Sequence, residues 1–323
     1  MKRRIFLLAA GTLAVPLAAF GQAKPRRIGF LGSGSRAAVS QALEEFRAGL
    51  REHGYVEGRN IVVEYRWGEG RFERMPELAA EMVRLKPELI AVWGSPAAAA
   101  VKAATTTVPI VLVSVGDPEE TGLVASLARP GGNVTGMGNL GGSVVTKQLE
   151  LLRQVVPGVN RLAVLRNPGN LSHGPQTKGA VSAARTLGMQ VQFYDVRSLD
   201  DIHAAFAAMA ATRSNGLLVL ADPLFLTQAK AIADLAIRHR LPAVTARSEI
   251  ADAGLMIAYG ASNLEAFRTG ATYVDKILRG AKPADLPVQQ SALFEFIVNL
   301  KTAKALGIQF PPQLLVRADR VIQ

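Results

Sequence analysis

The feature that most constrains the fold is a repeated change from short apolar runs to longer segments with one apolar face. Residues 27–31 form such a run, and a turn rich in Gly and Ser follows them. Within residues 39–50, apolar side chains recur at intervals of four, three and four residues, which is the spacing of an amphipathic helix. Continuous apolar strands that alternate with helices indicate parallel sheets covered on both faces. The chain is therefore expected to have an α/β fold.

The alternation occurs as two series of similar length. The expected strands of the first series are 27–31, 61–65, 89–93 and 109–113. The second series starts near Arg161, and its expected strands are 161–165, 191–196, 216–221, 243–245, 255–259 and 294–298. The expected helices are 39–50, 75–85, one from Ala97, one to Leu187, 200–212, 226–240, 264–278 and 299–306. Two such series predict two doubly wound parallel-sheet lobes.

Residues 1–23 have the features of a secretory signal peptide. Three basic residues at positions 2–4 precede an apolar stretch from Ile5 to Phe20, and small residues stand before a cleavage point after Ala23. The apolar stretch is short for a membrane span and is interrupted by Gly and Pro. The segment predicts export by the Sec or the twin-arginine route. A retained anchor helix is the alternative, and the absence of Cys excludes a lipoprotein anchor.

Composition excludes several classes of function. The chain has 323 residues and no Cys, which excludes disulfide scaffolds, thiolate metal sites and cysteine nucleophiles. Its four His residues do not stand within one helical turn of each other, so we expect no metal centre. The net charge of +11 is scattered along the sequence, which favours a solvated basic surface over a nucleic-acid-binding site.

Polar side chains at the ends of the expected strands are the candidate ligand-binding residues. In open α/β sheets, ligands bind beyond the carboxyl ends of the strands. The residues that we select at these positions are Ser33, Ser35, Ser95, Pro96, Asp117, Asn167, Asn170, Asp222, Glu249 and Tyr259.

Each candidate also has an ordinary structural explanation. Pro96 suits the first turn of a helix, where free N–H groups favour an anion such as a carboxylate, but Ser95 is equally consistent with a plain N-cap. Asp222 is either an acceptor for a ligand amine or the start of a helix. Tyr259 and Phe225 either stack on an aromatic ligand or pack in the core.

Two enzymatic alternatives fit the sequence poorly. The glycines in 29–34 do not have the spacing of a dinucleotide-binding fingerprint. The glycine and serine residues near Ser33 and Ser95 do not form a nucleophile elbow, and no His stands where a catalytic triad would require it. We therefore expect no catalytic residue and no cofactor.

Several long motifs resemble the substrate-binding component of ABC importers, in the tryptophan/tyrosine-type family. They lie at 52–67, 122–136, 273–287, 299–307 and 317–319, and so span nearly the whole mature chain. The segment 253–260 departs from the family pattern at the border of the expected hinge.

The resemblance implies a type I periplasmic-binding-protein fold, with three crossovers between the lobes and a ligand enclosed between them. The expected crossovers lie near 138–142, at Gly260 and at 283–287. The expected first lobe is 24–140 with 261–287. The expected second lobe is 141–260 with 288–323.

We predict an exported, non-enzymatic solute-binding protein that captures a small ligand by hinge closure. The resemblance implies an amino acid, with an aromatic one favoured, and partners in an inner-membrane ABC permease and its ATPase. We expect a periplasmic monomer that binds no nucleic acid. A ligand-sensing protein that presents its ligand to a membrane receptor and an exported α/β hydrolase are the alternatives.

Overall fold

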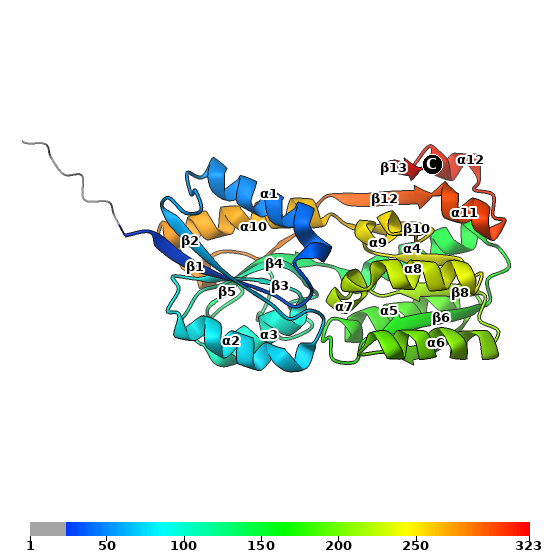
Figure 1. Cartoon of the computed structure of the whole chain (residues 1–323), viewed down its shortest axis with the longest axis horizontal. Coiled ribbons are helices and arrows are strands. Elements are labelled where there is room, and N and C mark those ends of the chain that lie inside the picture. The colour runs from blue at the N-terminus through cyan, green and yellow to red at the C-terminus, as the bar shows by residue number, and fades with distance from the viewer. Residues whose placement is uncertain (1–23) are drawn as a thin grey trace, which may run out of the picture.

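The computed structural model describes residues 24–323, so the predicted signal peptide lies outside the described residues. The chain forms two α/β lobes side by side along the long axis of the molecule (Figure 1). Among residues 24–323, no helix has the length and apolar character needed to span a membrane.

The first lobe is built on a six-stranded sheet with the strand order β11-β5-β4-β3-β1-β2. Its strands are β1 (Arg26–Gly32), β2 (Ile61–Trp67), β3 (Ile90–Trp93), β4 (Ile110–Gly116), β5 (Val134–Asn139) and β11 (Gln289–Gln290). All of the pairs in this sheet are parallel. Its helices are α1 (Ser40–Glu52), α2 (Met75–Arg84), α3 (Ser95–Ala104) and α10 (Asn263–Leu278), with short 3-10 turns at 37–39, 72–74 and 283–285.

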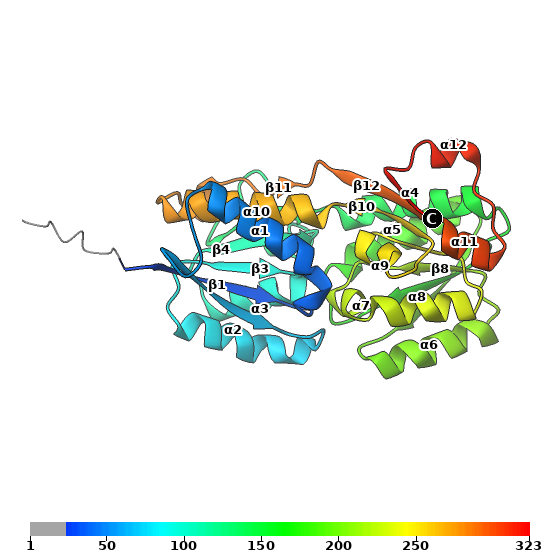
Figure 2. The same ribbon diagram turned by 45° about the horizontal axis from the view of Figure 1, so that its top comes forward.

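Helices cover both faces of this sheet, which explains its continuous apolar runs. In β1, Phe30 packs toward α1 and α10, whereas its neighbour Leu31 packs toward α2 and α3. In Figure 2, α1 and α10 lie together on one side of the strands. Successive side chains of a strand point to opposite faces, so a strand that is buried on both faces must be apolar throughout.

The second lobe is built on a seven-stranded sheet with the order β13-β12-β10-β9-β8-β6-β7. Its strands are β6 (Arg161–Arg166), β7 (Gln190–Asp195), β8 (Gly216–Val219), β9 (Ala243–Thr245), β10 (Ile257–Ala261), β12 (Phe294–Asn299) and β13 (Arg320–Ile322). The pairing of β10 with β12 is antiparallel, whereas the sequence predicted a wholly parallel sheet. The cause is the third crossover, which returns the chain to this sheet next to β10.

Only some of the helices of the second lobe were expected from the sequence. The helices of this lobe are α4 (Gly141–Val155), α5 (His173–Thr186), α6 (Leu199–Ala211), α7 (Pro223–Thr227), α8 (Ala229–Arg238), α9 (Ser248–Asp252), α11 (Leu300–Leu306) and α12 (Pro312–Leu315). The single helix expected over 226–240 is wrong, because the chain forms two helices that meet at Gln228. Asn299 caps α11 as its side chain accepts from Thr302 N–H at 3.1 Å.

Strand β5 and helix α4 were not expected from the sequence. Glycines in β5 and at the start of α4 obscure both patterns. Gly136 has φ of +126°, and a Cβ there would collide with the backbone of Leu112 on the neighbouring strand. The glycine therefore allows β4 and β5 to approach closely.

The chain passes between the lobes at 139–141, 261–263 and 291–293. The sequence predicted the first two near 138–142 and at Gly260, which is a residue of β10. The third was predicted at 283–287 but follows β11, whose residues Gln289 and Gln290 pair with β5 in the first sheet. The prediction that 288–323 belongs wholly to the second lobe is therefore wrong for these two residues, because backbone pairing at a sheet edge leaves little trace in side-chain pattern.

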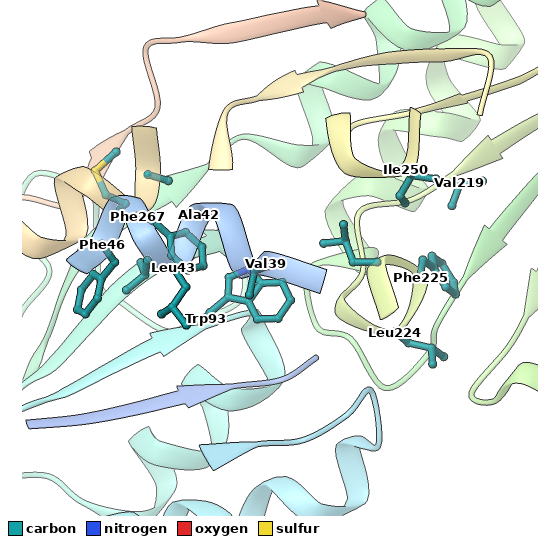
Figure 3. Packing of buried hydrophobic residues seen from close by; sticks show 14 of the residues in the cluster. Val39, Ala42, Leu43, Phe46, Trp93, Val219, Leu224, Phe225, Ile250 and Phe267 are labelled. Carbon is teal, nitrogen blue, oxygen red and sulfur yellow. The ribbon is translucent and has the colours of Figure 1, made fainter. Parts of the chain in front are cut away.

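The two lobes are packed against each other. One apolar cluster contains Val39 and Trp93 of the first lobe together with Leu224 and Phe225 of the second, and Figure 3 shows its members on both sides of the junction. The backbone N–H of Ser35 also donates to Thr227 Oγ1 across the junction at 3.1 Å.

Candidate functional site

A cavity with about 660 Å³ of empty space, part of it open to solvent, lies between the lobes. It lies at the carboxyl ends of strands from both sheets, where the α/β topology places ligands. Its lining includes Trp93, Ser95, Ser114, Gly116, Asn139, Val144, Val145, Asn170, Ser172, Asp222, Leu226 and Arg247.

Asp222 supplies a buried carboxylate to this cavity. It precedes α7, and its Oδ1 accepts from the Leu224 N–H at 2.8 Å as the N-cap of that helix. Its Oδ2 accepts from Asn170 Nδ2 at 2.8 Å. Burial raises the pKa of Asp222 above its usual value, because the charged form is poorly solvated there. A cationic group in the cavity would stabilise that charge.

His173 lies beside Asp222 but does not neutralise it. Its Nδ1 accepts from the Asn167 N–H at 2.9 Å, so its Nε2 carries the proton and donates to the Ala221 carbonyl at 3.1 Å. Burial lowers the pKa of His173, which keeps the imidazole neutral. Although Nε2 lies 3.6 Å from Asp222 Oδ2, the carboxylate is left without a cationic partner among the described residues.

Arg247 supplies the opposite charge and was missed in the sequence analysis. Its Nη1 donates to Asn263 Oδ1 at 2.8 Å, but its enclosed Nε has no hydrogen-bond partner within residues 24–323. Burial lowers its pKa from the usual value; an Arg guanidinium nevertheless stays protonated at neutral pH. The signal was available, because Arg247 follows β9 by two residues, just before the selected Glu249.

Apolar side chains form much of the remaining wall. Trp93 at the end of β3, Val144 and Val145 on α4, and Leu226 on α7 all line the cavity. Of the described residues that line it, Asp222 and Arg247 are the two that carry charge. The cavity therefore offers one acceptor for a cation, one donor for an anion and an apolar surface beside them.

Three of the candidates selected from the sequence line this cavity, namely Ser95, Asn170 and Asp222. The hydroxyl of Ser95 on the first lobe forms a hydrogen bond with that of Ser172 on the second. Helix α3 begins at Ser95, two residues earlier than expected, so its N-terminus faces the cavity.

Four other candidates have structural roles outside the cavity lining. Ser33 Oγ accepts from the Ala97 N–H at 2.9 Å, in the first turn of α3, where Pro96 also lies. Ser35 contacts Thr227 across the lobe junction. Asn167 accepts from the Gly169 N–H at 3.0 Å within a turn.

The last three candidates lie near the crossovers. Glu249 accepts from Asn263 Nδ2 at 2.7 Å. Tyr259 packs in the core against Phe294, with a ring-centroid distance of 6.0 Å. Asp117 accepts from the Gly141 N–H at 3.0 Å, at the first crossover.

Burial raises the pKa of Asp117 to about 6, although N–H groups of Gly141 and Gly142 oppose the shift. This pKa is higher than the pKa of Asp117 in the unfolded chain. The contribution of Asp117 to the free energy of unfolding is therefore complete below about pH 4 and is lost as pH rises through about 6. At about pH 8 the ionised carboxylate costs on the order of 3 kcal/mol. Asp117→Asn keeps an acceptor for Gly141 and suits the positive φ of +45° at this position.

We therefore expect Asp117→Asn to increase the free energy of unfolding at about pH 8 by roughly 1–3 kcal/mol, and to have little effect near pH 4. Urea unfolding at both pH values measures this. Glu77→Gln, which removes an exposed carboxylate on α2 that does not contribute to the pKa shift of Asp117, is the control and should change stability by less than about 0.5 kcal/mol. A loss of stability at pH 8 would contradict the argument.

Known proteins share this architecture. Residues 33–322 match the family described as ABC transporter substrate binding protein. A tyrosine-binding protein of Clostridioides difficile is 24% identical over 286 residues, covering 88% of this chain and 82% of that protein. A crystal structure from Streptococcus pneumonia, described as an ABC domain in complex with L-Trp, has a TM-score of 0.86 at 23% identity and covers 93% of this chain and 100% of that one.

The two lobes of this chain contact each other beside the cavity, as the hydrogen bond between Ser95 and Ser172 shows. The ligand-free, open structure of a Clostridium difficile substrate-binding protein has a TM-score of 0.65, at 25% identity and with coverage of 92% of this chain and 99% of that one. The two-lobe fold, the cavity between the lobes and the match over nearly all of the described chain agree, and this chain belongs to the ABC transporter substrate-binding protein family.

Proposed function

We propose that the chain binds an α-amino acid with an aromatic side chain in the cavity between its lobes. The ligand's ammonium group lies against Asp222, its carboxylate accepts from Arg247, and its side chain packs on the apolar wall that includes Trp93. The observation that carries the proposal is a buried carboxylate and a half-buried guanidinium in one cavity, with apolar surface beside them. A buried charge is costly unless it is paired, and a zwitterion pairs both.

The relatives support this choice of ligand. One is described as a tyrosine-binding protein, and the structure of another contains L-Trp. Ser95 and Asn170 complete the proposed site, because both line the cavity and come from different lobes. Closure of the lobes around the ligand is driven by contacts that only the closed form makes.

The closed form docks on an ABC permease in the inner membrane, which works with its ATPase. We propose that the chain is exported to the periplasm after cleavage behind Ala23 and acts there as a monomer. Substrate-binding proteins of ABC transporters are generally exported, and residues 1–23 have the composition of a secretory signal.

Isothermal titration of residues 24–323 with a matched ligand series tests the proposal. The protein is unfolded and refolded first, so that ligand carried through purification is removed. We expect L-Trp or L-Tyr to bind, whereas tryptamine, which lacks the carboxylate, and indole-3-propionate, which lacks the ammonium group, bind at least about a hundredfold more weakly.

Thermal unfolding gives an independent measure. A ligand at about 100 times its dissociation constant adds roughly 2.7 kcal/mol, which should raise the midpoint by roughly 5–10 °C. Binding of both truncated analogues as strongly as the amino acid would contradict the assignment of Asp222 and Arg247. Binding of sugars alone would contradict the ligand class.

A further inference from the structure

Asn263 is the centre of a buried polar network that joins the two lobes. It is the first residue of α10 and is 3% exposed. Its Oδ1 accepts from Ser114 Oγ of the first lobe at 3.0 Å and from Arg247 Nη1 of the second at 2.8 Å. Its Nδ2 donates to Glu249 Oε1 of the second lobe at 2.7 Å. One side chain thus holds two charged groups of the opposite lobe.

The network lies where the chain crosses between the lobes. Asn263 ends the second crossover, and Asn139, which donates to Ser114 Oγ at 2.9 Å, begins the first. The N–H of Ser262 donates to the Leu293 carbonyl at 3.0 Å, which joins the second crossover to the third. A change in the angle between the lobes must therefore be accommodated around Asn263.

The network also faces the cavity with unused hydrogen-bonding capacity. Arg247 and Asn139 both line the cavity. Arg247 Nε and Asn139 Oδ1 are buried, and neither atom has a partner within residues 24–323. Unpaired buried donors and acceptors are costly, so these two atoms indicate where ligand groups complete the network. Asn263 fixes the orientation of the guanidinium that presents Nε.

We propose that Asn263 is a positioning residue that aims Arg247 at the ligand and at the same time stabilises the closed arrangement of the lobes. Its contacts to Arg247 and Glu249 cross the lobe junction, whereas its contact to Ser114 stays within one lobe. The ligand part of this role rests on the proposed function; the effect on the lobes does not. Apparent affinity is reduced by the fraction of molecules that are not in the binding-competent form, so loss of Asn263 weakens binding through both effects.

The absence of Cys permits a direct measurement of the lobe arrangement. Spin labels at Ala80→Cys on α2 and Ala207→Cys on α6 place one exposed label on each lobe of the otherwise wild-type chain. Electron–electron double resonance without ligand then reports the distance between the lobes. We expect Asn263→Ala to shift the ligand-free distribution away from that of the wild type and to weaken binding of L-Trp or L-Tyr by about tenfold or more.

Asn299→Ala is the matched control. Asn299 is also 3% exposed, but its bonds to Ala251 and Thr302 stay within the second lobe. The Asn299→Ala substitution should lower the free energy of unfolding without changing the distribution of distances between the lobes. Asn263→Asp, which keeps the acceptor for Arg247 but places a carboxylate against Glu249, is the second variant and should also shift the distribution.

An unchanged ligand-free distribution in a folded Asn263→Ala or Asn263→Asp protein would overturn the proposal, as would an equal shift in Asn299→Ala. If the distribution shifts as expected but neither amino acid binds the wild type, the proposed ligand is wrong and the role of Asn263 in lobe closure stands.

Discussion

Replacing Asp222 by Asn is expected to weaken the binding of an aromatic amino acid by more than about a hundredfold, which corresponds to roughly 3 kcal/mol. The side chain is fully buried and shaped similarly in the variant, so the change removes the charge and one of the two hydrogen bonds that Asp222 accepts, from Leu224 N–H and from Asn170 Nδ2. The ligand's ammonium group would then be buried without its counter-ion, and this desolvation is the main cost. Isothermal titration of the variant with L-Trp and L-Tyr measures the loss.

The ligand-free Asp222→Asn protein should be about as stable as the wild type, because the loss of one accepted hydrogen bond opposes the gain from removing a buried charge. Burial raises the pKa of Asp222, so its ionised form costs stability in the absence of a ligand cation. Protonation of Asp222 removes the charge that binds the ammonium group. The affinity of the wild type for the amino acid should therefore fall as pH is lowered toward this raised pKa, and the affinity of the variant should not depend on pH in this way.

Asp252→Asn, which removes an exposed carboxylate paired with Arg320 outside the cavity, controls for net charge. Equal affinity of the Asp222→Asn protein and the wild type would show that the ammonium group is bound elsewhere.

Replacing Gly116 by Ala is expected to prevent complete closure of the lobes and to reduce affinity by about a hundredfold. A Cβ on Gly116 would lie 2.8 Å from both Cβ and Oγ of Ser172, which belongs to the other lobe. The backbone of Gly116 does not have a positive φ, so alanine is accommodated once the lobes separate. Spin-label distances and titration calorimetry with L-Trp or L-Tyr measure the two effects.

A double variant distinguishes closure from a direct effect on the ligand. Ser172→Gly removes both atoms that the new methyl group would meet, so Gly116→Ala with Ser172→Gly should regain the closed distance distribution and affinity relative to Gly116→Ala alone. Gly174→Ala, where a Cβ has no neighbour within 4 Å, should leave both measurements unchanged. If the double variant does not regain the closed distance distribution, the collision with Ser172 is not what prevents closure in Gly116→Ala.

The roles of the predicted site residues show how far local sequence can lead. The rule that ligands lie at strand ends selected Asp222, Asn170 and Ser95, which line the cavity. The same rule also selected Ser33, whose hydroxyl accepts from an N–H in the first turn of α3 instead. Both kinds of residue follow a strand and precede a helix, so their sequence patterns are alike. They differ in which way the side chain points, and that depends on packing.

The sequence by itself determined the two α/β lobes, because strands buried on both faces require continuous apolar runs and amphipathic helices require a 3.6-residue period. It also placed the carboxylate of Asp222 at a strand end, whereas Arg247 was found only in the structure. Only the tertiary structure decided that both charges face one cavity and that Asn263, Arg247 and Glu249 meet. These contacts join residues from different lobes, and their geometry is set by the angle at which the lobes close, which no local pattern records.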